Sequence, residues 1–201
     1  MRHKVRPVLA AVVLGMTSLL SSTAASAAPI AYTASQTSTS PPSAPGGRCP
    51  DGTNLAAIGD NVGTASGTST FGPYEPTTSH CISGPVDGVR TISDGLFTWL
   101  YEKGSLFGTY VGLVYPTETL GVFNPVQDYT ITGGTGLFAG ATGSVTSNGL
   151  ISFGPGGVST LNLEFTGQID IPAPPAAALF GLAALGLAVR RQRNARLAAV
   201  G

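Results

Sequence analysis

The chain has 201 residues, which suits one domain with accessory segments. Seven of its ten basic residues lie at the two ends, so the middle keeps three basic against ten acidic residues, a charge of −7. A basic surface is therefore missing where a nucleic-acid-binding protein needs one, and we expect no nucleic-acid partner.

The first 27 residues have the three-part layout of a secretory signal peptide. Arg2, Lys4 and Arg6 form a basic leader, Val8 to Leu20 is an apolar run, and Ala25-Ser26-Ala27 is an A-x-A cleavage signal. We expect cleavage after Ala27 and export of the mature chain. The alternative is an uncleaved anchor, which the small residues after Leu20 disfavour because a membrane span needs about 20 apolar residues.

Residues 28–47 are rich in Ser, Thr, Ala and Pro and carry no charge. This composition predicts a flexible linker, because such a segment has too little apolar surface to bury. We therefore expect the folded domain over residues 48–171, which is long enough for one small core.

Two cysteines, Cys49 and Cys81, are the only ones in the chain. In the oxidising compartment that an exported protein enters, they are expected to form a disulfide with each other; two free thiols are the alternative. His80, the only histidine of the mature chain, adjoins Cys81. No C-x-x-C or H-x-x-x-H spacing accompanies these three residues, so we expect no zinc site.

Strand-forming residues dominate the expected domain, where short β-branched and aromatic runs alternate with Gly and Pro. About seven strands at this spacing imply a barrel or a sandwich. In Leu106–Tyr115 both faces are largely apolar, and its glycines suggest tight curvature. The expected strands are Asn61–Thr70, Val89–Tyr101, Leu106–Tyr115, Gln127–Thr132, Ala141–Ser147, Gly149–Phe153 and Ser159–Ile169.

A glycine-rich stretch, Ile131 to Val145, contains the G-x-G-x-x-G/A spacing of a dinucleotide-binding turn at Gly134, Gly136 and Ala139. Such a turn must open a helix and be followed about 20 residues later by a carboxylate. Here Gly140–Gly149 is poor helix material, and the next carboxylate is Glu164. We therefore predict a turn between two strands, with glycines at positive φ, and no nicotinamide cofactor.

The C-terminal residues 172–201 begin with a proline-rich break at Pro172, Pro174 and Pro175. An apolar run of 14 residues follows, Ala176 to Val189, and then the basic cluster Arg190, Arg191 and Arg193. With Ile171 and the prolines the segment reaches 19 residues, just enough to span a bilayer, and the arginines would stay on the cytoplasmic side. A core helix is the alternative, but the run has no polar face.

This tail resembles the PEP-CTERM sorting signal, which combines a short Pro-rich motif, a hydrophobic helix and an Arg cluster. The resemblance covers about Ile171 to Arg193, and Ile171-Pro172-Ala173-Pro174 stands where the usual motif is Val-Pro-Glu-Pro. It implies export to the cell envelope or extracellular space and at least transient membrane anchoring by the C-terminal helix. It also implies processing by an exosortase-type enzyme and an association with exopolysaccharide matrix.

A second resemblance is carried by Tyr129 to Gly143 together with Gly108-Thr-Tyr-Val-Gly112. These residues are similar to the β-barrel shared by allene oxide cyclases and dirigent proteins, and the similarity covers about Gly84 to Asp170. It implies a small antiparallel barrel of about eight strands in which the glycine stretch links adjacent strands. The cavity and acidic site residues of those families have no matching spacing here, so no catalytic residue is transferred.

Three functions remain open on these grounds. The first is a non-catalytic envelope or matrix protein, supported by the two terminal segments. The second is a barrel that binds or isomerises a small apolar molecule in its lumen, with Glu102, Glu118, Tyr110 or Tyr129 as a polar handle. The third is an ice- or carbohydrate-binding face on Thr-rich strands. We expect the first, because the mature chain has one histidine and no paired carboxylates.

Overall fold

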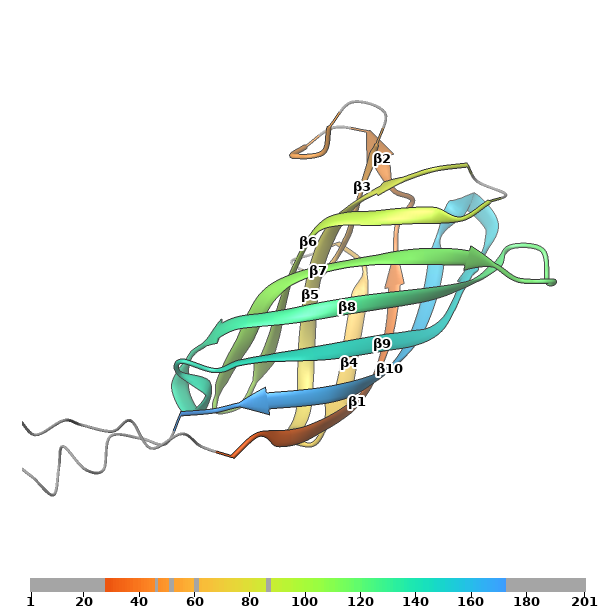
Figure 1. Ribbon diagram of the computed structural model, residues 1–201. Helices are drawn as coiled ribbons and strands as arrows, with labels where there is room; N and C mark the ends of the chain where they lie inside the picture. Colours follow the sequence, from red (N-terminus) through yellow and green to blue (C-terminus); the bar gives the residue numbers. More distant parts are fainter. Residues whose placement is uncertain (1–27, 46, 51–52, 60–61, 86–87, 173–201) are drawn as a thin grey trace, which may run out of the picture.

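The computed structural model describes residues 28–45, 47–50, 53–59, 62–85 and 88–172, and confirms that this part of the chain is all-β. Its strands form one antiparallel sheet (Figure 1). They are β1 (Ile30–Ser40), β2 (Ala44–Pro45), β3 (Asn54–Ile58), β4 (Thr64–Ser69), β5 (Gly72–Ser83), β6 (Arg90–Tyr101), β7 (Gly104–Pro116), β8 (Val122–Gly134), β9 (Thr142–Phe153) and β10 (Ser159–Asp170).

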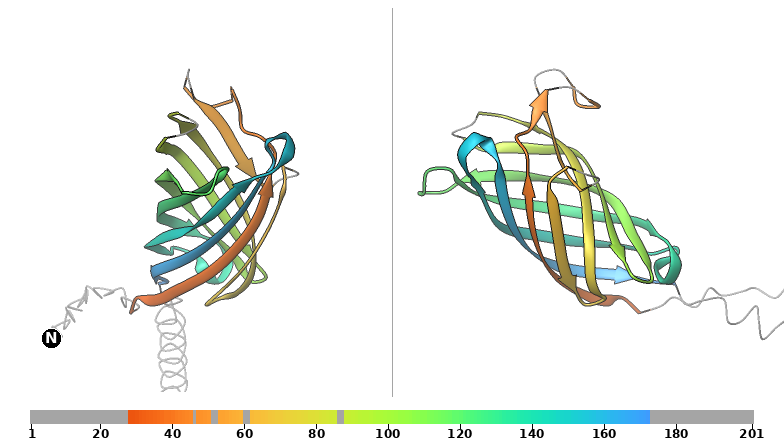
Figure 2. Two further views of the ribbon diagram at one scale, coloured as in Figure 1. Left: turned by 90° about the vertical axis from the view of Figure 1, so that its right-hand side faces the viewer. Right: turned by 180° about the vertical axis from the view of Figure 1, so that it is seen from behind.

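Eight of these strands close into a barrel, as predicted. The ring runs β5-β4-β1-β10-β9-β8-β7-β6, and pairing of β5 with β6 closes it. β3 pairs with the C-terminal half of β5 outside this ring, and the two-residue β2 pairs with β3. Figure 2 shows the strands wrapped around a common axis, with β2 and β3 at one end.

The barrel has two ends that differ in what meets there. At the end that we call the tail end, β1 begins and β10 finishes, beside the turn between β6 and β7 and the connection from β8 to β9. At the opposite end, which we call the mouth, β1 finishes, β10 begins and the β7–β8 loop projects (Figure 1). Because the strands alternate in direction, every connection belongs to one end or the other.

The predicted segments 1–27 and 173–201 fall outside the described residues. They contain the predicted signal peptide and most of the predicted sorting segment, including Pro174, Pro175, Arg190, Arg191 and Arg193. None of the helices in the described ranges is both long enough and apolar enough to cross a bilayer.

The prediction of a flexible linker over residues 28–47 is wrong for most of its length, because Ile30–Ser40 is strand β1. This strand pairs with β10 over its full length and with β4 over its second half. Its buried side chains alternate strictly, but three of them, Gln36, Ser38 and Ser40, are polar. The alternation is therefore invisible as a hydrophobic pattern, and the barrel domain begins near Ile30 rather than at residue 48.

Strand β5 was also missed, and β9 was predicted as two pieces. The sequence of β5 contains Pro73 and Pro76, and proline within a run argues against a paired strand. Pro76 nevertheless stands opposite Trp99 of β6, inside the barrel wall. Gly149 interrupts the pattern of β9 because a Cβ there would collide with the carbonyl oxygen of Asn162 on β10.

Aromatic side chains fill the lumen from the tail end to beyond its middle. Trp99 is fully buried and stacks on Tyr32 of β1, with ring centroids 5.4 Å apart and planes 7° apart. It also packs edge-on against Phe165 of β10 at 5.4 Å and lies 5.7 Å from Tyr129 of β8. Each such pair adds about 0.5–1.5 kcal/mol beyond the burial of its surface.

The glycine-rich stretch connects β8 to β9 through a single 3₁₀ turn, Gly136–Phe138, as the turn prediction requires. Gly136, Gly140 and Gly143 have positive φ, whereas Gly134 does not. The side chain of Phe138 points from this turn into the core and packs against Tyr101 at 5.0 Å. The turn thereby closes the tail end of the lumen.

Gly136→Ala should destabilise the fold more than Gly156→Ala. Both glycines have positive φ, which costs an L residue about 1–2 kcal/mol. A Cβ at Gly136 would also come 2.2 Å from the carbonyl oxygen of Lys103, whereas nothing lies within 4 Å of one at Gly156. Overpacking typically adds about 1–3 kcal/mol. Denaturant unfolding measures both variants, and equal losses would contradict the close approach at Gly136.

A disulfide joins Cys49 to Cys81, with Cα atoms 5.5 Å apart and a sequence separation of 32. Cys81 is fully buried on β5, and Cys49 lies in the segment that leads into β3. The bond therefore attaches this segment to the barrel wall. Because both sulfurs are in the bond, they are not available as metal ligands.

Replacing both cysteines by Ala should lower the free energy of unfolding by up to about 3–4 kcal/mol, because the crosslink lowers the conformational entropy of the unfolded chain. The β3–β5 ladder already restrains the same loop, so a smaller loss is compatible with the structure. Thiol labelling of the denatured, non-reduced protein should give no signal. Two reactive thiols under those conditions would show that the bond does not form in the protein.

Candidate functional site

The mouth half of the lumen is lined by polar side chains, in contrast to the aromatic half. Gln36, Ser38 and Ser40 of β1 are buried there, and Gln127 of β8, Ser147 of β9 and Ser159 of β10 join them. Burying an amide or hydroxyl without a partner costs about 1–3 kcal/mol. These buried polar groups therefore need hydrogen-bond partners, and their arrangement defines the candidate site.

His80 faces this region because it shares strand parity with the buried Tyr74 and Thr78 of β5, and a bulge of β6 lies opposite it. Two residues of β6, Asp94 and Gly95, stand opposite His80 of β5, and Asp94 has φ of 51°. The close approach of Tyr110 requires glycine at position 95, because a Cβ there would lie 2.6 Å from the Tyr110 ring. Here the imidazole meets the phenol of Tyr110, with Nδ1 and the hydroxyl oxygen 2.6 Å apart.

Burial determines the protonation of this pair. It lowers the pKa of His80 from 6.5 to about 4, and Arg48 and Arg90 act in the same direction. Burial also raises the pKa of the Tyr110 hydroxyl, against smaller opposing effects of Thr78 and Arg48. At neutral pH both groups are uncharged, and the tautomer of the imidazole sets which of the two donates in this hydrogen bond.

A second network lies beside the first. Tyr129 stacks on Tyr110 with ring centroids 4.7 Å apart, and its hydroxyl donates to Oε1 of Gln127 over 2.7 Å. Ser147 donates to the same oxygen over 3.1 Å. Burial raises the pKa of Tyr129, and the neighbouring Tyr110 raises it further. The two networks are therefore neutral hydrogen-bonded systems that join β5, β7, β8 and β9.

A cavity of about 70 Å³ opens where these strands reach the mouth. Its wall includes His80, Arg90, Ser40, Ser159 and Phe153, and the hydroxyls of Ser40 and Ser159 are 3.0 Å apart. Burial lowers the pKa of Arg90, and its Nε has no hydrogen-bond partner among the described residues. The space suits a few waters or a small ion, since pockets for drug-sized ligands occupy about 300–1,000 Å³.

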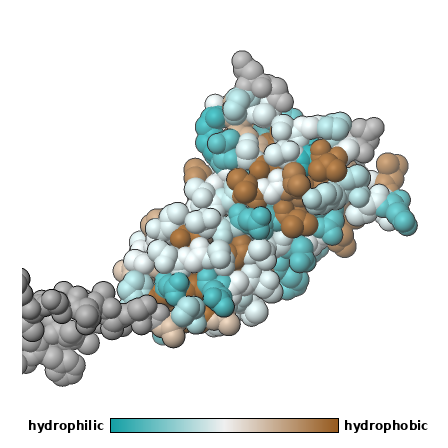
Figure 3. Space-filling view, viewed as in Figure 1, coloured by the Kyte–Doolittle hydropathy of each residue, from teal (hydrophilic) through white to brown (hydrophobic). Residues whose placement is uncertain are grey.

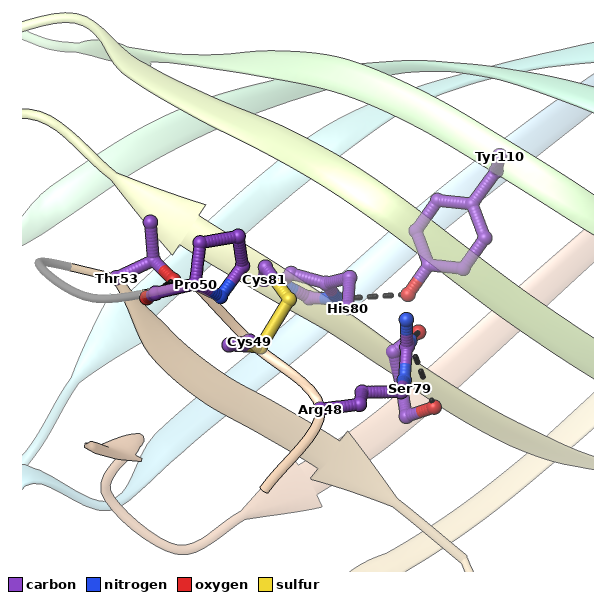
Figure 4. Close-up of a disulfide and its surroundings, with 8 residues drawn as sticks. All are labelled: Arg48, Cys49, Pro50, Thr53, Ser79, His80, Cys81 and Tyr110. Atoms are coloured by element: carbon purple, nitrogen blue, oxygen red, sulfur yellow. Dashed lines mark hydrogen bonds between the residues drawn. A yellow bond between two sulfur atoms is a disulfide. The ribbon is translucent and has the colours of Figure 1, made fainter. Parts of the chain in front are cut away.

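The disulfide segment braces the outer side of this site (Figure 4). Arg48, next to Cys49, donates to the carbonyl oxygen of Ser79 over 2.8 Å and reaches the Ser79 hydroxyl at 3.2 Å. Cys81 lies on the other side of His80 in β5, so both neighbours of the histidine are held from outside while its ring faces Tyr110. The crosslink therefore supports the direction of His80.

Of the four polar handles that the sequence suggested, the structure brings two together. Tyr110 and Tyr129 are buried in the lumen and in contact, as described above. Glu102 is exposed in the turn after β6, at the tail end, and Glu118 is exposed in the β7–β8 loop, at the mouth. Among the described residues no carboxylate is buried. The described part of the interior therefore has no carboxylate that could act as a general base.

Sequence reasoning missed His80, Gln127 and Gln36 as interior residues. For Gln127 a signal was present, because it shares strand parity with Tyr129 and Ile131. For His80 a signal was present as well, because it shares strand parity with the buried Tyr74 and Thr78, but the prolines of β5 argue against a strand there. Gln36 lies in β1, where the composition predicts a linker, and its Oε1 has no partner among the described residues.

The outer wall of the barrel is largely polar. Hydroxyl side chains pair across strands, as in Thr39–Thr64, Thr37–Asn162 and Thr146–Thr166. Figure 3 shows pale and teal side chains over most of this face, with apolar ones gathered over β6–β8. That patch includes Leu113 and Val126, which are directly opposite each other on β7 and β8.

Comparisons with protein-family models, curated proteins and solved structures find no match to this chain. The site must therefore be read from its own chemistry. That chemistry consists of a neutral His–Tyr pair, a tyrosine–amide–serine network and a small cavity with one arginine.

Acid should destabilise the protein through His80. Its neutral form is favoured in the folded state, so the stabilisation is complete above pH 6.5 and is lost as the pH falls from 6.5 through about 4. The upper limit of this loss is about 3 kcal/mol. Denaturant unfolding at a series of pH values should show a flatter profile for His80→Gln than for the wild type.

Tyr110→Phe is the matched control, because it removes the hydrogen bond and keeps the buried imidazole. It should lower stability at neutral pH and retain the acid-dependent loss. If His80→Gln and the wild type have parallel pH profiles, the imidazole does not titrate in the way its burial implies.

Proposed function

We propose that this chain is an exported protein of the cell envelope or extracellular matrix, sorted by its C-terminal segment, in which the barrel has a non-catalytic role. The observation that carries this proposal is the filled lumen. Trp99 and the rings around it occupy the middle of the barrel, and the cavity left at the mouth measures about 70 Å³. The barrel is thus built as a packed module rather than as a container.

The chemistry of the interior supports the same proposal. Acid–base catalysis needs a group whose protonation changes near the working pH and a partner that exchanges the proton. Burial keeps Tyr110 and Tyr129 protonated, and it keeps His80 neutral well below pH 6.5. No buried carboxylate accompanies them within the described ranges.

A barrel that binds or isomerises a small apolar molecule is the second candidate. It would need an apolar space in the lumen, where Tyr32, Trp99 and Phe165 pack against one another instead. The mouth cavity is polar on the side of His80 and Arg90 and is small. These features favour the non-catalytic proposal over this alternative.

The proposed partners follow from the same reading. They are the membrane that takes up the apolar run Ala176–Val189, an exosortase-type enzyme that recognises the segment around Pro172, and exopolysaccharide. The hydroxyl-rich wall, exemplified by Thr37 and Asn162, is compatible with a hydrated polysaccharide because it offers paired donors and acceptors with little charge.

A chain that ends at Pro172 should fold and be exported but lose membrane retention. It keeps all of β10 and also Ile171, which packs against the core. Replacing Arg190, Arg191 and Arg193 by Ser in the full chain should weaken retention less completely, because the apolar run remains. The readout is the distribution of each variant among membrane, matrix and culture-medium fractions.

The wild type should appear in the membrane or matrix fraction and the truncated chain in the medium. If the truncated chain stays with the membrane to the same extent as the wild type, the barrel makes the membrane contact and the sorting proposal fails. A chain retained inside the cell in every form would contradict export.

A further inference from the structure

An apolar groove of about 540 Å³ crosses the tail end of the barrel. Phe71, Tyr101 and Phe138 form its base, where Phe71 and Phe138 pack at 5.2 Å. Leu137 and Ile30 stand at its edge, with exposed fractions of 63% and 36%. Lys103 and Glu102 also line it and have opposite charges, so the groove has no strong charge of its own.

Both ends of the barrel domain lie in this groove. Ile30, the first residue of β1, and Ile171 and Pro172, which follow β10, are part of its wall. Ile30 is paired with Ile169 in the β1–β10 ladder, which holds the two ends together. The chain therefore passes directly from the wall of the groove into the proline-rich segment.

The length of that segment limits how far the groove can be from a membrane. Only Ala173, Pro174 and Pro175 separate Pro172 from the first residue of the apolar run, Ala176. Pro-rich chain extends by about 3.1 Å per residue, so the four steps from Pro172 to Ala176 reach about 12 Å. The headgroup layer on each side of a bilayer is about 5–8 Å thick. If the apolar run enters the hydrocarbon at Ala176, this reach of about 12 Å keeps the groove at or close to the headgroup layer.

We propose that this groove is a lipid-contacting surface: the tail end of the barrel rests on the membrane that holds the C-terminal run, and Leu137 and Ile30 enter the headgroup region. The proposal rests on the proposed function and adds the orientation of the barrel to it. The occupant is a bilayer surface because apolar side chains surround the exit point of a short tether that leads to an apolar run. The mouth, with His80 and Arg90, then faces away from the membrane.

The test uses the full mature chain in phosphatidylcholine vesicles and one spin label at a time. Both native cysteines are in the disulfide, so Leu137→Cys gives a single labelling site at the groove. Leu120→Cys is the matched control, since Leu120 lies in the β7–β8 loop at the mouth and is fully exposed at 101%. Accessibility to oxygen, which concentrates in lipid, is compared with accessibility to a water-soluble nickel chelate.

Addition of vesicles should shift the label at position 137 toward oxygen and away from nickel, and should leave the label at position 120 unchanged. A second measurement places the label at the neighbouring, exposed Ala139 and combines it with Leu137→Asp. The aspartate should return that label to water, and Leu137→Ile should not. Co-flotation of every variant with vesicles and an unchanged melting curve show that the tail and the fold are intact.

Two results would overturn the proposal and leave the proposed function standing. One is a chain that floats with vesicles while both labels stay accessible to the nickel chelate, which means that the barrel does not contact the membrane. The other is a label at position 137 that is shielded from both reagents before vesicles are added, which means that the chain's own tail or a second copy covers the groove. A full chain that does not float at all contradicts the proposed function, and the orientation fails with it.

Discussion

The packing of Trp99 is the constraint on which the rest of the barrel depends. Its indole reaches from β6 across the lumen and contacts rings from β1, β5, β8 and β10. An eight-stranded barrel is just wide enough for side chains to fill it, so one ring in the middle sets the distance between opposite walls. With the middle occupied, most of the buried polar side chains lie toward the mouth, and the interior is left with hydrogen-bonding capacity but little space.

Sequence reasoning reached the all-β class, the barrel and the disulfide, because these depend on local chemistry: aromatic and β-branched runs, glycine turns and an even number of cysteines. It failed where the lumen is polar. In the mouth half of β1 the buried residues are Gln36, Ser38 and Ser40. Because they are polar, this part of the sequence has the composition of a linker. In the site it found Tyr110 and Tyr129 but not His80, because Pro73 and Pro76 conceal strand β5, in which His80 shares the inward parity of the buried Tyr74 and Thr78.

The two ends of the barrel divide the chemistry of the molecule between them. At the mouth, the disulfide segment supports the wall beside a small cavity from outside, and the His80–Tyr110 pair does so from inside. At the tail end, the turn that contains Phe138 closes the lumen, and the exposed Leu137 in the same turn faces outward. A single glycine-rich connection thus seals the interior and supplies the outer apolar edge, which explains why it needs several residues with positive φ.

The pairing of β1 with β10 has a consequence for the order of events during folding. The first strand of the barrel meets the last one, with Ile30 opposite Ile169, so the ring can close only when nearly the whole domain is present. Until then β1 has an open edge that can pair with another chain, as unprotected strand edges do. The outer face of β1 is rich in hydroxyls, and its inward side chains in the mouth half are polar, so the unpaired strand exposes little apolar surface. This composition therefore suits a strand whose partner β10 is the last to become available.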